Sequence, residues 1–194
     1  MIKFLGRSKC KTAVFISGNG SNLKNLIKFS LSKKSPIKVE FVISNSFKAK
    51  GLNFAKQFKI KYKIYRFLDQ KKDESKILLY LKKNNINLIC LAGFMKILSK
   101  NFIKNYKNNI LNIHPSLLPK YKGLDTHQRA IKNNEKFSGC TVHLVNHKLD
   151  SGKIIMQKKV KIRKNDTPKK LAKKILKQEH VLYPKAIRKL LTNL

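Results

Sequence analysis

The 194-residue sequence contains no long hydrophobic run. A membrane-spanning helix needs roughly 18 or more consecutive apolar residues, and no stretch of that length occurs. Residues 1–7 also lack the extended apolar centre of a secretory signal peptide. We therefore expect a cytoplasmic protein with no membrane partner.

Cysteine is scarce as well. The three cysteines, Cys10, Cys90 and Cys140, lie far apart and have none of the short spacings that metal ligands share. Two of them stand in apolar, strand-like runs, which is typical of small core residues. The histidines lack metal-ligand spacing too, so the sequence predicts no metal site.

Acidic residues are few: nine Asp and Glu stand against 45 Lys and Arg, and the formal net charge is +36. Such a charge is typical of nucleic-acid-binding proteins. The lysines, however, recur in every segment, mixed with Asn and Ile, and all three residue types have A/T-rich codons. A biased base composition of the gene is therefore a sufficient explanation of the charge, and we prefer it to a specific nucleic-acid function, which is the minority alternative. We expect non-specific attraction to polyanions and no specific nucleic-acid partner.

Alternating strand and helix patterns predict an α/β fold: a mostly parallel, twisted sheet flanked by helices, with a Rossmann-like N-terminal half. Residues 1–11 are polar and basic and are expected to form an extension before a single domain, residues 12–194. Strands are expected at 12–16, 39–45, 60–67, 87–92, 110–113, 138–145 and 154–162. Helices are expected from about 22, at 49–58, 70–84 and 126–133, and from 167.

Asn112 and His114 stand at the end of a short apolar strand that stops at prolines. Ligands of open α/β sheets bind beyond the carboxyl ends of the strands. Two residues apart, the two side chains point to the same side of a strand. They offer an amide that can polarise a carbonyl and an imidazole that can move a proton. This pair suits attack by an amine on an acyl group, although a single His after a strand is more often structural.

A glycine-rich turn, residues 17–22, lies between a predicted buried strand and a predicted helix. This geometry aims free backbone N–H groups at an anion, and Ser21 or Asn22 can cap the helix. The turn matches neither the dinucleotide pattern nor a Walker loop. A purely structural tight turn is the alternative. A second polar loop, residues 146–152, contains Asp150, and an Asp in this setting is most often a turn residue.

The run L-N-I-H-P-S-L-L-P-K-Y-K-G at 111–123 resembles the signature of the folate-dependent formyltransferases. Three more segments match in the family's order: G-N-G-S-N-L at 18–23, M-K-I-L at 95–98 and L-D-S-G at 149–152. The resemblance covers about residues 12–187. It is strongest to the branch that acts on 5-phosphoribosylglycinamide.

The resemblance implies that the protein transfers the formyl group of 10-formyltetrahydrofolate, its cosubstrate, to the amine of 5-phosphoribosylglycinamide. This step belongs to de novo purine (IMP) biosynthesis. It implies small-molecule substrates and no metal, and it leaves open a monomer or a homodimer.

The resemblance also implies roles for individual residues. Those expected to be catalytic are Asn112, His114 and Asp150. The expected substrate contacts are Gly20, Ser21 and Asn22 for the phosphate and Glu179 for the amine. The expected folate contacts are Met95, Lys96, Ile97, Leu98, Asn112, Leu149 and Asp150. The family's folate-contacting Arg has no clear counterpart, and Lys71 or Lys72 is the nearest cation.

Three other functions remain as alternatives. Methionyl-tRNA formyltransferase shares the N-x-H-x-S-L-L-P element, but it has a further C-terminal RNA-binding domain and lacks G-N-G-S-N. A formyltetrahydrofolate hydrolase usually has an additional N-terminal regulatory domain. Neither additional domain is expected here. A basic nucleic-acid-binding module with a decayed active site is the third, and the presence of Asn112, His114 and Asp150 together argues against such decay.

Overall fold

The computed structural model describes residues 9–192. In this part of the chain seven strands form one sheet of order β3-β2-β1-β4-β5-β6-β7. The described residues divide into two compact units. The first comprises the chain up to Leu111 together with Leu191 and Thr192, and the second comprises Asn112–Leu190.

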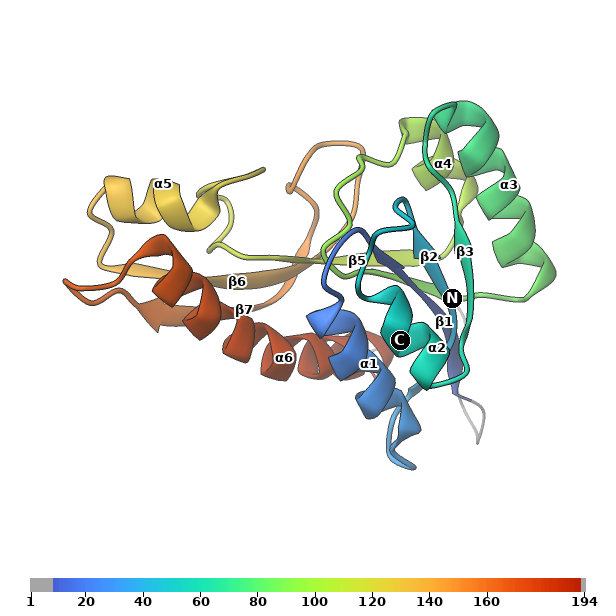
Figure 1. Ribbon diagram of the computed structural model, residues 1–194, viewed down its shortest axis with the longest axis horizontal. Coiled ribbons are helices and arrows are strands. Elements are labelled where there is room, and N and C mark those ends of the chain that lie inside the picture. Colours follow the sequence, from blue (N-terminus) through green and yellow to red (C-terminus); the bar gives the residue numbers. More distant parts are fainter. Residues whose placement is uncertain (1–8, 193–194) are drawn as a thin grey trace. The chain divides into compact units, whose positions relative to one another are not determined.

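The first unit contains four complete parallel strands (Figure 1). These are β1 (Cys10–Ile16), β2 (Ile37–Ser44), β3 (Lys61–Ile64) and β4 (Leu88–Leu91). Its helices are α1 (Ser21–Leu31), α2 (Leu52–Gln57), α3 (Gln70–Lys83) and α4 (Lys100–Asn105). Strands β2 and β4 pair with β1 on its two edges, and the apolar side chains of β1 are fully buried, as expected for a central strand of a parallel sheet. The carboxyl end of β1 leads directly into the glycine-rich turn.

The second unit is built around an antiparallel pair, β6 (Phe137–Leu144) and β7 (Ile154–Lys161). Helix α5 (Thr126–Lys132) precedes this pair, and α6 (Pro168–Thr192) follows it. Figure 1 shows α5 and α6 on opposite sides of the two strands. Strand β5 (Asn109–His114) begins in the first unit and ends in the second. The loops that follow β5 and β6 build the site described below.

Helix α6 starts where the sequence indicates a cap. The Thr167 hydroxyl accepts a hydrogen bond from the Lys170 N–H, and Pro168 occupies the first turn, where a missing N–H costs nothing. The helix continues through Pro184. Its buried face consists of Leu171, Ile175, Glu179, Leu182, Tyr183, Ala186 and Ile187. The only acidic member of this face is Glu179, the residue expected to contact the substrate amine.

The predicted α/β fold with a mostly parallel sheet is confirmed. Strand β3 is shorter than the expected strand 60–67 and exposed along its length. The chain leaves the sheet because the Phe67 N–H donates to the Asp73 carboxylate of α3 at 2.8 Å, with φ of 57° at Phe67. No helix within residues 9–192 is long and apolar enough to cross a membrane.

The N-terminal boundary differs slightly from the expectation. Strand β1 begins at Cys10, so Cys10 and Lys11 belong to the sheet and not to a basic extension. Lys11 pairs with Lys38 in the β1–β2 register. The remainder of the expected extension, residues 1–8, lies outside the described residues, and the single-domain interpretation stays a prediction.

Candidate active site

Strand β5 delivers Asn112 and His114 to one side of the sheet. The alternate residues of this strand, Leu111 and Ile113, are buried, so Asn112 and His114 share the opposite side. Asn112 is half-buried and His114 is 5% exposed. The strand ends at Pro115, which places His114 at its carboxyl end.

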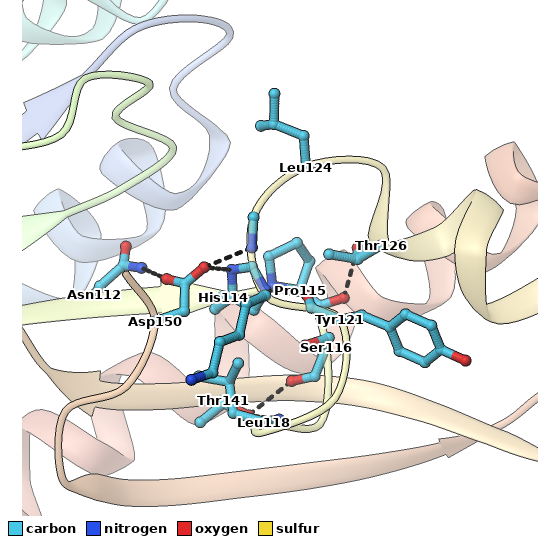
Figure 2. A network of polar contacts seen from close by, with 12 residues as sticks. Asn112, His114, Pro115, Ser116, Leu118, Tyr121, Leu124, Thr126, Thr141 and Asp150 are labelled. Carbon is cyan, nitrogen blue, oxygen red and sulfur yellow. Dashed lines mark hydrogen bonds and ion pairs between the residues drawn. The ribbon is translucent and has the colours of Figure 1, made fainter. Parts of the chain in front are cut away.

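Asp150 comes from the loop between β6 and β7 and meets these two residues (Figure 2). Its Oδ2 lies 3.3 Å from His114 Nδ1, and its Oδ1 lies 3.4 Å from Asn112 Nδ2. The Gly123 N–H donates to Oδ2 at 2.9 Å. Residues that are 36 to 38 positions apart in the chain therefore converge on one carboxylate that is only 8% exposed.

The protonation of His114 follows from its neighbours. Its Nε2 lies 2.8 Å from the backbone carbonyl of Tyr121, so Nε2 carries a proton, and Nδ1 faces Asp150. Burial lowers the pKa of His114 below its ordinary value. The Tyr121 carbonyl and the Asp150 carboxylate oppose this lowering, because both stabilise the charged ring. The ring is therefore neutral at rest near pH 7.

The surroundings of Asp150 shift the pKa of its carboxyl in the direction that favours the charged carboxylate. Burial would raise the pKa of its carboxyl, but hydrogen bonding with His143 and with the Gly123 N–H outweighs burial, and the charge of His114 adds to them. The pKa of Asp150 is therefore lowered. A stable carboxylate next to a neutral imidazole is suited to hold a proton that arrives at Nδ1.

His143 belongs to the same cluster and was not singled out from the sequence. It is 2% exposed on β6, and its Nε2 lies 3.2 Å from Asn112 Nδ2 and 3.5 Å from Asp150 Oδ1. Its Nδ1 lies 2.8 Å from the Leu144 carbonyl oxygen, which fixes the ring. The available signal in the sequence was the polar pair Thr141 and His143, which are two residues apart and hence on one side of the strand.

Buried hydroxyls hold the start of the loop after β5. The Ser116 hydroxyl donates to the Lys120 carbonyl at 2.7 Å, and the Thr141 hydroxyl donates to the Ser116 carbonyl at 2.7 Å. The Thr126 hydroxyl donates to the Pro115 carbonyl at 3.0 Å. Because these groups are buried, each bond would be costly to break without replacement. The loop that follows His114 is thus held at several points, as Figure 2 shows.

The glycine-rich turn lies in the first unit. Gly20 has φ of 71° and caps α1, and its carbonyl accepts the first helical bond from the Lys24 N–H. The leading N–H groups of an α-helix have no partner within the helix, and they point beyond its N-terminus. Ser21 and Asn22 open this helix. An anion is the natural ligand of such a turn.

Gly51 supports the turn from the start of α2. Its N–H donates to the Gly18 carbonyl at 3.0 Å. A Cβ on Gly20 would lie 2.4 Å from the Gly51 Cα, and one on Gly51 would lie 2.7 Å from an Ile16 methyl. The two backbones therefore approach as closely as they do only because neither residue has a side chain.

The residues expected to contact a folate differ in exposure. In the first unit, Met95, Lys96 and Ile97 are exposed, whereas the Leu98 side chain is buried and offers only its backbone. In the second unit, Leu149 is 51% exposed next to Asp150. Lys71 and Lys72 are exposed in the first turn of α3. Glu179 is 7% exposed on α6.

Metal ligands do not cluster in this part of the chain. Within residues 9–192, no group of three or more His, Cys, Asp or Glu side chains is placed to hold a metal ion. The three cysteines are buried and form no disulfide bond, and burial raises the pKa of Cys10 to about 11 and that of Cys140 to about 12. Neither thiol is therefore a nucleophile near neutral pH.

Residues 10–187 match the sequence profile of the family described as "Formyl transferase". The chain belongs to this family. It is 42% identical over 181 residues to the phosphoribosylglycinamide formyltransferase of Haemophilus influenzae, covering 92% of this chain and 85% of that protein. The crystal structure of the phosphoribosylglycinamide formyltransferase of Brucella melitensis superposes with a TM-score of 0.90 at 41% identity, covering 95% of this chain and 96% of that one.

Other relatives are much longer. The chain is 37% identical to the human "Trifunctional purine biosynthetic protein adenosine-3", which it matches over 94% of its own length and 18% of that protein. It spans 14% of the corresponding protein of Chironomus tentans. Within the formyl transferase family, the chain therefore corresponds to one part of these trifunctional proteins.

Proposed function

We propose that this formyl transferase family member moves the formyl group of 10-formyltetrahydrofolate to the primary amine of 5-phosphoribosylglycinamide, in de novo purine (IMP) biosynthesis. The observation that carries the proposal is the convergence of Asn112, His114 and Asp150 at the end of β5. The names of the Haemophilus and Brucella relatives support the choice of acceptor.

Each unit offers candidate contacts for the donor. Exposed apolar side chains suit a flat pteridine ring, and we propose Met95 and Ile97 in the first unit and Leu149, next to Asp150, in the second. The donor supplies the formyl group, whose carbon is open to attack by a nitrogen nucleophile. Lys71 or Lys72 would contact its glutamate tail in place of an arginine.

The acceptor would be held at its phosphate. Gly20, Ser21 and Asn22 form the N-terminus of α1, and the positive end of the helix dipole there favours a phosphate. Glu179 would contact the amine, since a carboxylate buried on α6 stabilises a positively charged or hydrogen-bond-donating nitrogen.

Asn112 would stabilise the transition state. As the amine attacks, negative charge develops on the formyl oxygen, and Asn112 Nδ2 donates a hydrogen bond to it. The present contact of Nδ2 with Asp150 Oδ1, at 3.4 Å, is long and is therefore easily exchanged. A preorganised donor of this kind typically contributes about 3 kcal/mol.

His114 and Asp150 would carry the proton. The neutral ring accepts the proton that the attacking nitrogen releases, at Nδ1, and the imidazolium then has Asp150 Oδ2 on one nitrogen and the Tyr121 carbonyl on the other. Its charge also stabilises the oxyanion. The proton passes to the folate nitrogen as the carbon–nitrogen bond breaks, which yields the formamide and tetrahydrofolate.

The location and partners follow from this function. We propose a cytoplasmic enzyme with small-molecule substrates, as a monomer or homodimer, with no metal and no specific nucleic-acid partner. The charge of +36 supplies non-specific attraction to polyanions.

The proposal is tested by following loss of the formyl group of 10-formyltetrahydrofolate with and without 5-phosphoribosylglycinamide. We expect turnover that requires this acceptor and produces one formamide per folate released. Turnover without any acceptor would instead indicate a hydrolase, and turnover only with methionyl-tRNA would indicate the tRNA enzyme. Absence of turnover together with salt-sensitive binding of random RNA would indicate a nucleic-acid-binding module.

A further inference from the structure

The segment Tyr121–Leu124 contacts the His114–Asp150 pair through its backbone. The Tyr121 carbonyl accepts a hydrogen bond from His114 Nε2 at 2.8 Å. Two residues later, the Gly123 N–H donates to Asp150 Oδ2 at 2.9 Å. One short segment thus holds both members of the pair, and in Figure 2 Leu124 lies above the pair and Tyr121 to its right. We refer to it as the backbone cradle.

The cradle has a backbone conformation that an isolated chain would rarely adopt. Tyr121 has φ of 57° and Gly123 has φ of 76°, both in the left-handed region, as is Asp125, which directly follows the cradle, with φ of 55°. Residues with a Cβ hold such angles only where surrounding contacts determine them. The contacts that fix the cradle therefore also fix the positions of the Tyr121 carbonyl and the Gly123 N–H.

Arg129 of α5 provides one of these contacts. One of its terminal nitrogens, Nη1, donates to the Lys122 carbonyl at 2.7 Å and to the Leu124 carbonyl at 3.2 Å. These two carbonyls flank Gly123. The guanidinium carbon also lies 5.1 Å from the centre of the Tyr121 ring. Arg129 therefore holds the cradle on both sides of the N–H that binds Asp150.

The Tyr121 side chain provides the second contact. Its hydroxyl donates to Glu135 Oε1 at 2.9 Å and accepts from Asn133 Nδ2 at 3.0 Å. Glu135 in turn forms an ion pair with Lys120 at 2.7 Å. The ring is thus anchored at its far end to the turn between α5 and β6, while its backbone carbonyl faces His114.

We propose that Arg129, together with the Tyr121–Glu135 hydrogen bond, is a positioning device that orients His114 and Asp150 through the backbone cradle. The inference rests on the proposed catalytic function of that pair. Arg129 touches neither His114 nor Asp150 through a hydrogen bond described here, and it acts by fixing the peptide groups at Tyr121 and Gly123. Misplacement of catalytic groups by about 1 Å can lower a rate 100-fold, so such support has kinetic consequences.

When Arg129 is replaced, the direction in which the pKa of His114 changes distinguishes a positioning role of Arg129 from a simple effect of its charge. The charge of Arg129 lowers the pKa of His114, and the Tyr121 carbonyl raises it. The other charged or titratable groups that act on His114 are Asp150, His143 and His127. If Arg129 acted only by its charge, removing that charge would raise the pKa of His114. If it holds the cradle, loss of the Tyr121 contact lowers that pKa.

The test uses the full-length enzyme and compares Arg129→Gln, Arg129→Lys and Tyr121→Phe with the control Lys132→Gln. Lys132 is an exposed cation on the same helix. We expect kcat to fall about tenfold in Arg129→Gln and Tyr121→Phe, with both KM values within about twofold, and partial recovery in Arg129→Lys. NMR titration of the His114 ring should show a lowered pKa in the first two variants. The control should match the parent enzyme.

A raised His114 pKa in Arg129→Gln, or unchanged kcat in both Arg129→Gln and Tyr121→Phe, would overturn the proposal. Tyr121→Phe removes one hydroxyl only, so it keeps the test valid if Arg129→Gln fails to fold. The NMR titration does not depend on activity. If His114 variants turn over normally, the proposed catalytic role fails, but the titration still decides whether the cradle responds to Arg129.

Discussion

At the scale of single residues, the Asp150 carboxylate joins four partners in the candidate site. One carboxylate oxygen receives the Gly123 N–H and faces His114, and the other faces Asn112 and His143. All four partners present, or can present, a hydrogen-bond donor. An Asn at position 150 would place its NH2 group, a hydrogen-bond donor, against some of these donors. It would also remove the negative charge that stabilises a protonated His114.

Asp150→Asn is therefore expected to lower kcat by roughly 100-fold or more, with a small change in KM. The double variant Asp150→Asn/His114→Ala should have a kcat only slightly below that of the less active single variant, because the effects of residues that act as a unit are not additive. Steady-state kinetics of the two single variants and the double variant measure this. Asp166→Asn is the control, since Asp166 is a buried carboxylate paired with Lys174 outside the cluster. Normal turnover of Asp150→Asn would contradict the proposed mechanism.

The Asp150→Asn variant should also change the dependence of kcat/KM on pH. Burial places the pKa of His114 below its ordinary value of about 6.5, so kcat/KM should stay level near neutrality and fall on the acid side, where the ring becomes protonated. The Asp150 charge raises that pKa. Its removal should move the acid limb to still lower pH in whatever activity remains, and a shift to higher pH would contradict the assignment.

At the scale of elements, the glycine-rich turn depends on two glycines from different segments. Gly20 needs both a positive φ and space, whereas Gly51 has an ordinary φ of −59° and needs only space. The β1–α1 turn and the start of α2 therefore form one supporting structure for the proposed phosphate site. Any side chain at either position must push the two backbones apart.

Gly20→Val is expected to raise the KM for 5-phosphoribosylglycinamide by about tenfold or more and to leave that for the folate nearly unchanged. Gly51→Ala should show the same asymmetry to a smaller degree. Initial rates with each substrate varied in turn provide the measurement, and Lys50→Ala, an exposed neighbour, is the control. Equal increases for both substrates would mean that the turn is not a dedicated phosphate site.

At the scale of the whole molecule, stability should depend on pH with a definite sign. Burial lowers the pKa of three histidines, His114, His127 and His180. Below about pH 6.5 the unfolded chain binds protons at these positions that the folded chain does not, so acid favours unfolding. Asp150, Glu135 and Asp166 have lowered pKa values, and their contribution is also lost as pH falls. Both groups act in the same direction.

We therefore expect the free energy of unfolding to decrease steadily from about pH 7.5 to pH 5, with the histidines responsible for the first part of the decrease. Urea unfolding at several pH values measures it. The net charge of +36 adds self-repulsion, so the series should be repeated at high salt, which screens that repulsion but leaves the contribution of the buried and half-buried histidines in place. A stability that is flat over this range would contradict the burial of the three rings in their neutral form.

Short-range pattern in the sequence determined much of the fold. The apolar run before Gly18 predicts β1, because a short continuous apolar run is typical of a buried parallel strand, and Thr167 with Pro168 predicts the start of α6. Neighbouring residues suffice for such inferences. They also place Asn112 and His114 on one side of β5. The boundaries of β3 were not predictable, because the Asp73 carboxylate that ends this segment comes from the following helix.

Tertiary structure alone decided which groups surround the reactive pair. His143 enters the cluster only because β6 brings it to within 3.2 Å of the Asn112 amide. Gly51 matters only because folding packs it against Gly20, and Arg129 only because α5 places its guanidinium at the backbone cradle. Burial likewise outweighs Asp150 in setting the pKa of His114, because it lowers that pKa more than the Asp150 charge raises it. Distances and solvent exclusion depend on the whole chain, whereas a local pattern reports only which residues are chemically able to act.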